Sequence, residues 1–242
     1  MNSISVFAPA TVANVACGFD IFGFAVARPG DQITLTVTDE PGVRITNITG
    51  DGIAIQTYLR HIGRTDLGLD VVLHKQMPLG SGLGSSAASA VAGVYAVNEL
   101  LGRPLPTMKL LPFAMEGERF ACGSAHADNV APALLGGFVL VRSYAPLDVV
   151  RIPTPGGLYC TLVHPHIEVN TKDARYILKK DIPLPHTITQ MGNVAGLVVG
   201  LMQADYALIG RSLVDVIIEP VRALLIPGFA AVKAAALQAG AL

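Results

Sequence analysis

The residues with the clearest chemical purpose lie in a glycine- and serine-rich segment, MPLGSGLGSSAAS at residues 77–89. Its glycines stand at alternate positions, where they let the backbone adopt positive φ and approach a ligand closely. The segment leads from an apolar strand into an alanine-rich helix, whose first amide groups and positive dipole end attract anions. The sequence therefore predicts a phosphate-binding loop. The alternative is a flexible Gly-Ser turn, although a linker would not be bounded so closely by a strand and a helix.

This loop is neither of the two common phosphate-binding motifs. No lysine follows its last glycine, as a Walker loop requires, and its spacing differs from the dinucleotide-binding G-x-G-x-x-G. The phosphate charge must then be offset by a metal ion or by basic residues elsewhere. The hydroxyl groups of Ser85 and Ser86 are suited to Mg²⁺, with a carboxylate supplied by another segment.

The elements that must position this loop alternate in type along the chain. Period-two patterns or short apolar runs predict strands at residues 3–8, 31–38, 42–48, 69–75, 138–142, 149–152 and 159–164. Helical spacing predicts helices at residues 53–62, 85–101, 108–118, 187–202, 204–217 and 227–239, with a further short helix opening at residues 123–129. Strands dominate the first half and helices the second. This order predicts an α+β protein whose sheet is covered on one face.

Composition limits the function further. Of the 242 residues, 51% are hydrophobic and only 14% are charged, which excludes a disordered chain. The longest apolar stretches, residues 87–97 and 194–202, are shorter than the roughly 18 to 20 residues that span a bilayer, and the start MNSISVFAPA does not resemble a signal peptide. A net charge of -1 without a Lys/Arg cluster argues against nucleic acid. We therefore expect a cytoplasmic protein with no membrane or nucleic-acid partner, whose three scattered cysteines are reduced thiols.

Several segments resemble the motifs of one enzyme superfamily, the GHMP small-molecule kinases. Residues 78–88 match its central pattern P-x-x-x-G-L-G-S-S-A. The form found in homoserine kinases is resembled by APATVANVACGFD at 8–20, GSAHADNVAP at 123–132, TKDAR at 171–175, and EPVR at 219–222 followed by IPGF at 226–229. One departure is Ala16-Cys17, where that family commonly carries a glycine before Gly-Phe-Asp. The resemblance spans nearly the whole chain.

The resemblance implies a two-lobed α+β fold. Residues 1–150 would form an N-terminal lobe like ribosomal protein S5, with the phosphate loop, and residues 151–242 a C-terminal ferredoxin-like α/β-plait lobe that is incomplete at its C-terminal end. It also implies ATP and Mg²⁺. Ser86 and Glu118 would hold the metal ion, with Glu116 as a rival that the sequence alone does not separate from Glu118. The ATP-binding residues would be Pro78, Leu79, Gly80, Ser81, Gly82, Leu83, Gly84, Ser85, Ser86, Ala87, Ala88 and Thr171.

The same resemblance implies L-homoserine as the substrate, phosphorylated on its side-chain hydroxyl. Arg175 and Arg222 would bind its carboxylate, for which arginine is better suited than lysine. The ammonium would face Asp20 or Asp128, either of which could instead act as a base. The remaining candidates are polar: Asn14 and His126 for substrate hydrogen bonds, and Asn129 for the transferring phosphoryl group. We expect no dedicated base, because phosphoryl transfer depends mainly on alignment and charge stabilisation.

Two features of the family pattern are absent from these 242 residues. They are a third glycine-rich motif after the last predicted helix and a polar loop between Gly52 and Ile53. We expect that the sequence omits these segments, which would also explain its low charge. Other readings are a kinase of the mevalonate or shikimate type, whose substrates lack an ammonium group, and an inactive nucleotide-binding relative. A homodimer is implied by the resemblance alone.

Overall fold

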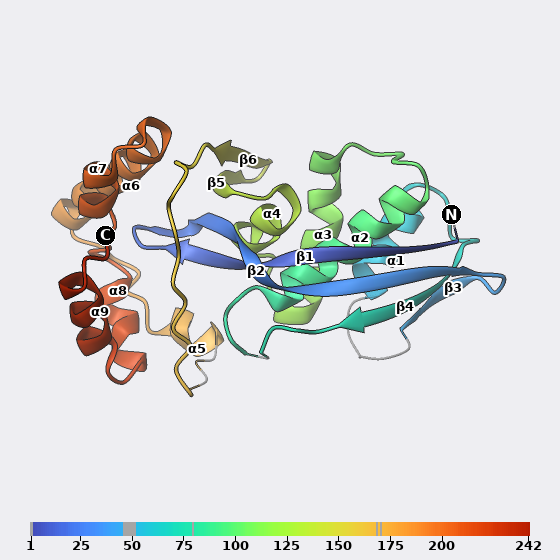
Figure 1. The fold of residues 1–242 in the computed structure, drawn as a ribbon, viewed down its shortest axis with the longest axis horizontal. Coiled ribbons are helices and arrows are strands. Elements are labelled where there is room, and N and C mark those ends of the chain that lie inside the picture. The colour runs from blue at the N-terminus through green and yellow to red at the C-terminus, as the bar shows by residue number, and fades with distance from the viewer. Residues whose placement is uncertain (1, 46–51, 79, 168, 170) are drawn as a thin grey trace. The chain divides into compact units, whose positions relative to one another are not determined.

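The computed structural model describes residues 2–45, 52–78, 80–167, 169 and 171–242. The chain divides into two compact units (Figure 1). Unit 1 comprises Met1–Ala13 and Asp20–Arg151, and unit 2 comprises Asn14–Phe19 and Ile152–Leu242. The division after Arg151 lies beside the boundary expected at residue 150, but the assignment of residues 14–19 to the second unit has no counterpart in the sequence analysis.

A mainly antiparallel sheet organises unit 1. Its described strands are β1 (Ser3–Val15), β2 (Gly18–Thr38), β3 (Gly42–Ile45), β4 (Gly68–His74), β5 (Phe138–Tyr144) and β6 (Leu147–Ile152). They run in the order β3-β4-β2-β5-β6, and β1 also pairs with β2. Strand β2 is antiparallel to β4 from Gln32↔His74 to Thr38↔Gly68, whereas β3 is parallel to β4. The predicted phosphate loop follows the end of β4, so this pairing fixes where the loop begins.

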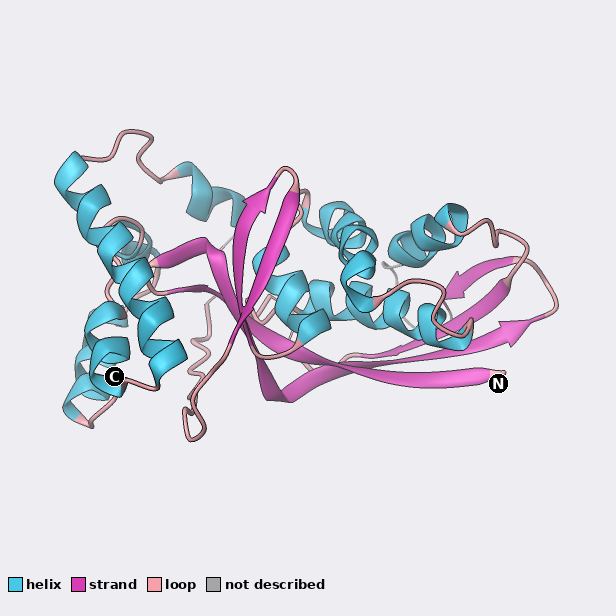
Figure 2. Cartoon of the chain, turned by 90° about the horizontal axis from the view of Figure 1, so that it is seen from above, coloured by secondary structure: helices cyan, strands magenta, loops and turns pink. Residues whose placement is uncertain are grey.

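Helices cover one face of this sheet (Figure 2). They are α1 (Gly52–His61), α2 (Ser85–Leu100), the 3₁₀ helix η1 (Thr107–Leu110), α3 (Leu111–Cys122) and α4 (Ala127–Leu135). Helix α2 consists mainly of small and apolar residues, and most of them are buried. The helix therefore packs against α1, α3 and α4 and does not lie on the surface. A Cβ on Gly117 would lie 2.8 Å from Ala54 Cβ, which shows how closely α1 and α3 approach.

Unit 2 contains helices that pack less extensively. They are α5 (Thr171–Tyr176), α6 (Leu184–Gln203), α7 (Tyr206–Ser212), α8 (Glu219–Arg222), the 3₁₀ helix η2 (Ala223–Leu225) and α9 (Phe229–Gln238). Helix α6 packs on α7 through buried residues that include Leu197 and Ile209. The described residues of α8 and α9 include none that is buried. On α6, one face carries large apolar side chains that are exposed: Leu184, Ile188, Met191, Val199 and Met202.

The expectation of a strand at residues 159–164 is wrong. The segment has no regular structure, and Tyr159 is 91% exposed. Among the described residues the segment pairs with no strand, so its backbone groups join no ladder, and alternation alone cannot form a strand. Of the other strand predictions, the one at residues 42–48 is confirmed up to Ile45, and residues 46–48 lie outside the described residues.

Within the described ranges, no single helix is long and apolar enough to cross a membrane. One bent pair, Glu219–Leu225 with Phe229–Gln238 at 116°, meets the length and composition criteria together.

Candidate active site

The predicted phosphate loop occupies the turn between β4 and α2 in unit 1. Gly80, Gly82 and Gly84 all have positive φ, of 69°, 72° and 67°, which explains why glycine occurs at alternate positions. Gly84 is the N-cap of α2 and has no side chain to cap the helix, so the loop leads directly into a helix N-terminus, the kind of site that attracts anions. Leu79 lies outside the described residues. This local geometry is what a phosphate group requires.

Thr11 of β1 and Asn129 of α4 meet against Gly84. The backbone amide of Thr11 donates to the Leu83 carbonyl at 3.0 Å, and Thr11 Oγ1 donates to Asn129 Oδ1 at 2.8 Å. A Cβ on Gly84 would overlap Thr11 Oγ1 and would lie 2.8 Å from Asn129 Oδ1. The contact therefore holds the predicted catalytic side chain of Asn129 next to the loop. The sequence analysis did not identify Thr11, although it lies within the resembling segment at 8–20.

Glu118 of α3 is a buried carboxylate with one unsatisfied oxygen. Only 3% of the residue is exposed, and its Oε2 has no hydrogen-bond partner among the described residues. Its Oε1 lies 3.5 Å from Nδ1 of His126, whose Nε2 is 2.9 Å from Ser124 Oγ. A buried carboxylate oxygen without a partner is costly unless a cation or donor reaches it. Glu118 therefore fits Mg²⁺, an ion that needs few protein ligands because phosphates and water complete its shell.

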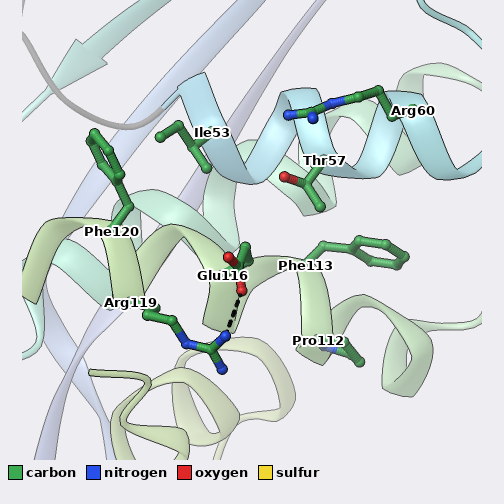
Figure 3. A pocket seen from close by; sticks show the side chains of 8 residues that line it. All are labelled: Ile53, Thr57, Arg60, Pro112, Phe113, Glu116, Arg119 and Phe120. Atoms are coloured by element: carbon green, nitrogen blue, oxygen red, sulfur yellow. Dashed lines mark ion pairs between the residues drawn. The ribbon is translucent and has the colours of Figure 1, made fainter. Parts of the chain in front are cut away.

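Glu116, the rival of Glu118, faces a different place. It lines a groove of about 730 Å³ between α1 and α3 and binds Arg119 at 3.1 Å (Figure 3). Apart from Glu116, no candidate site residue lines this groove, which is formed by Ile53, Thr57, Arg60, Pro112, Phe113, Glu116, Arg119 and Phe120. Two residues along a helix are turned by about 200°, so the two carboxylates lie on opposite faces of α3. In the described residues no cluster of three or more His, Cys, Asp or Glu side chains could hold a metal ion.

The two candidate aspartates both belong to unit 1 but differ in burial. Asp128, in the first turn of α4, is 1% exposed and both of its carboxylate oxygens are buried. Asp20 of β2 is half-buried, has a φ of 62°, and its carbonyl accepts a hydrogen bond from Tyr144 Oη at 2.8 Å. Gly23 of β2 lies against the Asp128 backbone, where a Cβ would overlap the carbonyl oxygen, so α4 can approach the sheet closely.

Two guanidinium groups in unit 2 gather at one aromatic ring. Arg175 of α5 and Arg222 of α8 place their Cζ atoms 5.2 and 5.7 Å from the ring centroid of Phe19, the second residue of β2. Each contact lies within the range of a cation–π interaction. Two half-buried cations at one ring form a strongly electropositive place that suits a carboxylate. These are the two arginines that the resemblance nominates.

The turn that precedes Phe19 is fixed by its backbone and by α6. Asn14 and Ala16 have positive φ, of 55° and 46°. For Ala16 this conformation is unfavourable, whereas a glycine would adopt it readily. The Cys17 carbonyl accepts a hydrogen bond from Gln190 Nε2 at 2.9 Å, and burial raises the pKa of the Cys17 thiol to about 11. A raised pKa disfavours the thiolate, so the Cys17 thiol is a weak nucleophile.

The candidate residues thus fall into two sets. Unit 1 contains the phosphate loop, Ser86, Glu118, His126, Asp128, Asn129 and Asp20, and unit 2 contains Asn14, Thr171, Arg175 and Arg222. Thr171 begins α5, but its side chain is outside the described residues. The sequence analysis also missed Asp31 and Lys75, which lie far apart in the chain and meet beneath the loop. No local sequence pattern links Asp31 in β2 with Lys75 after β4, so their contact could not be predicted from the residues around either one.

Comparison with known proteins identifies the class. The family described as "GHMP kinases N terminal domain" matches residues 48–137, a range that contains the predicted phosphate loop and α1 to α4. Homoserine kinase from Chlorobium phaeobacteroides (strain BS1) is 54% identical over 265 residues, covering 100% of this chain and 82% of that protein. Homoserine kinase from Arabidopsis thaliana is 45% identical over 260 residues, covering 99% and 70%. The chain belongs to the homoserine kinase family.

Solved structures agree with this assignment. The crystal structure of homoserine kinase from Cytophaga hutchinsonii ATCC 33406 superposes with a TM-score of 0.95 at 60% identity, covering 99% of this chain and 80% of that chain. L. major mevalonate kinase in complex with R-mevalonate shares the fold alone, with a TM-score of 0.63 at 17% identity over 87% of this chain and 72% of that chain. The predicted family and the predicted α+β fold are confirmed.

Proposed function

We propose that the protein transfers the γ-phosphoryl group of ATP to the side-chain hydroxyl of L-homoserine and releases O-phospho-L-homoserine, a step of threonine biosynthesis. The observation that carries this proposal is the junction of the phosphate loop with α2, together with the buried, unsatisfied carboxylate of Glu118. A glycine loop at a helix N-terminus suits the phosphates of a nucleotide, and a buried carboxylate with an unsatisfied oxygen suits the metal ion bound with it. Membership of the homoserine kinase family supports the choice of alcohol.

The nucleotide half of the reaction draws on unit 1. The amides at the start of α2 and of residues 80–84 bind the ATP phosphates, while Ser86 and Glu118 hold Mg²⁺. When bound, Mg²⁺ offsets phosphate charge and so supplies the neutralisation that a Walker lysine gives elsewhere. Asn129, held by Thr11, donates to the transferring phosphoryl group and stabilises its developing charge.

The amino-acid half draws on the arginines. Arg175 and Arg222 bind the homoserine carboxylate with directional, charge-assisted hydrogen bonds. Asp20 or Asp128 receives the ammonium group, and Asn14 and His126 bind polar substrate atoms. The hydroxyl proton passes to phosphate or solvent, because a loose transfer requires alignment more than deprotonation. We place the enzyme in the cytoplasm without membrane partners, and its net charge of -1 supports the absence of a nucleic-acid partner. A homodimer is implied by the family resemblance alone.

A panel assay tests this function. ATP consumption by the purified protein with Mg²⁺ is measured separately with homoserine, mevalonate and shikimate as the alcohol. We expect turnover with homoserine and less than about 1% of that rate with the other two, because they lack the ammonium group that an aspartate would bind. Turnover with mevalonate or shikimate instead would overturn the substrate, and ATP binding without turnover would favour an inactive nucleotide-binding relative.

The absence of a dedicated base is tested separately. The pH dependence of kcat is compared for the wild type, Asp20→Asn and Asp128→Asn. A kcat that falls by several orders of magnitude at unchanged KM in either variant would assign that aspartate as the base.

A further inference from the structure

We propose that Asp31 and Lys75 form a clamp that holds both ends of the phosphate loop in its binding conformation. In this view Lys75 is a positioning residue for ATP and does not itself bind phosphate. The inference rests on the proposed kinase function and adds residues to the same site. The clamp comprises Asp31 of β2, Lys75 directly after β4, and Ser85 and Ser89 of α2.

Asp31 ties the start of the loop to its end. Its residue is fully buried, and its Oδ1 accepts hydrogen bonds from the backbone amides of Gln76 and Met77, at 2.8 and 3.2 Å. Its Oδ2 accepts from Ser85 Oγ, in the first turn of α2, at 2.7 Å. One carboxylate thus holds the chain as it enters the loop and again where it leaves. The span between these contacts contains all three glycines with positive φ.

The ammonium group of Lys75 completes the clamp by donating hydrogen bonds to Ser85 and Ser89 of α2. Its Nζ donates to Ser85 Oγ at 2.9 Å, to the Ser85 carbonyl at 3.1 Å and to Ser89 Oγ at 2.6 Å, and it lies 3.4 Å from Asp31 Oδ2. An ammonium group has three protons, so these hydrogen bonds use all of them. The side chain is only 16% exposed and its charge is matched by a buried carboxylate. Lys75 therefore has no donor left for a phosphate oxygen.

This arrangement matters because the loop is intrinsically flexible. Glycines at alternate positions lose the most conformational freedom when a ligand fixes them. Contacts that hold the loop before ATP arrives reduce that loss, and the gain appears as affinity for the nucleotide. A clamp at the loop ends should therefore set the KM for ATP and leave homoserine binding largely unaffected.

Steady-state kinetics on single and double variants test the clamp. Lys75→Met, Asp31→Asn, Ser89→Ala and the double variant Asp31→Asn/Lys75→Met are compared with wild type for KM of ATP, KM of homoserine, kcat and melting temperature. Lys109→Met is the matched control, because Lys109 is an exposed lysine of η1. Ser89→Ala removes one hydroxyl, which accepts from Lys75 Nζ and donates to the Ser85 carbonyl, and it keeps the test open if a charge variant does not fold.

We expect Lys75→Met and Asp31→Asn each to raise the KM for ATP about tenfold, with the KM for homoserine within about twofold of wild type. Ser89→Ala should raise the KM for ATP about twofold to threefold, and the double variant should resemble either single variant because both break one network. Lys109→Met should change nothing.

Three results would overturn the clamp. An Asp31→Asn variant with unchanged or lower KM for ATP beside a raised KM in Lys75→Met would show that Lys75 contacts phosphate directly. Equal losses in both KM values and in melting temperature would show a purely structural network, and unchanged KM values in every variant would show no role. Failure of the kinase proposal is distinct, since the wild type would then show no turnover at the outset.

Discussion

The two units differ in how completely they bury their own residues. Unit 1 packs four α-helices on its sheet, and α2 is buried along most of its length. In unit 2, the described residues of α8 and α9 include no buried one, and α6 exposes a row of large apolar side chains. The first unit holds its candidate residues by tight backbone contacts, as at Gly84, whereas the second gathers its arginines around a single ring. Substitutions should therefore act differently in the two.

The largest loss of activity should come from adding a side chain at Gly84, where Thr11 and Asn129 contact the loop. We expect Gly84→Ala to lower kcat/KM for ATP at least about a hundredfold, because its Cβ would overlap Thr11 and displace Asn129. Gly82→Ala is the matched control, since Gly82 also has positive φ but a Cβ there meets nothing within 4 Å. Equal losses in the two variants would mean that backbone strain, and not the contact with Thr11, limits the loop.

The two carboxylates of α3 provide the next test. Glu118→Gln should lower kcat about a hundredfold and raise the Mg²⁺ concentration needed for half-maximal rate, because a buried charge at the cation is lost. Glu116→Gln should stay within about twofold, since Glu116 pairs with Arg119 on the opposite face. A magnesium titration of both variants measures this. A larger loss for Glu116→Gln would reverse the assignment.

In unit 2 the expected effect is on the amino acid alone. Arg222→Lys should raise the KM for homoserine about thirtyfold and leave the KM for ATP within about twofold, because lysine cannot make the paired hydrogen bonds of a guanidinium. Arg211→Lys, on an exposed position of α7, is the control. A rise in the KM for ATP instead would give the arginine a nucleotide role and remove the contrast between the units.

Removing a tyrosine hydroxyl should lower stability more at Tyr58 in unit 1 than at Tyr176 in unit 2. Tyr58→Phe deletes a buried hydrogen bond to Asn98 Oδ1 of 2.6 Å and should cost about 1 kcal/mol of unfolding free energy. Burial raises the pKa of Tyr58 from 10.0 to about 12, so the wild type should lose stability as the pH rises from 10 to 12, and the variant should lose less. Tyr176→Phe, on a side chain exposed in unit 2, should have no effect in the same denaturant titrations.

The smallest effect is expected on the apolar face of α6. Met191→Ala should change the unfolding free energy by less than about 0.5 kcal/mol because Met191 is 65% exposed. Leu197→Ala, on the buried face of the same helix, should cost about 3 kcal/mol. If Met191→Ala instead costs as much as Leu197→Ala, the exposed face is covered in solution and the contrast between the units is smaller than the structure indicates.

The features that could be predicted from the sequence are those that depend on residues close together in the chain. The glycine spacing of residues 80–84 and the alanine-rich helix after it define a loop whose geometry depends on neighbouring residues only. The difference in burial between Glu116 and Glu118 was also accessible, because Glu118 follows Leu111, Ala114 and Met115 on the buried face of α3. Helical period, applied to that one segment, would have favoured the buried acid.

Long-range pairings were not accessible in this way. Asp31 and Lys75 meet because β2 and β4 pair in a register that brings Gln32 opposite His74, which no local pattern reports. The same limit explains the wrong strand at residues 159–164, where a pattern suited to a strand found no neighbour to pair with.

The turn between β1 and β2 has a practical consequence for dividing the enzyme. Because Asn14–Phe19 belongs with Ile152–Leu242, the polypeptide passes from one unit to the other three times. A fragment produced by cutting after Arg151 would leave Gln190 without the Cys17 carbonyl and both arginines without the Phe19 ring. A split version of this kinase would have to keep residues 14–19 with the C-terminal fragment and residues 1–13 with the N-terminal one, because these two neighbouring stretches belong to different units.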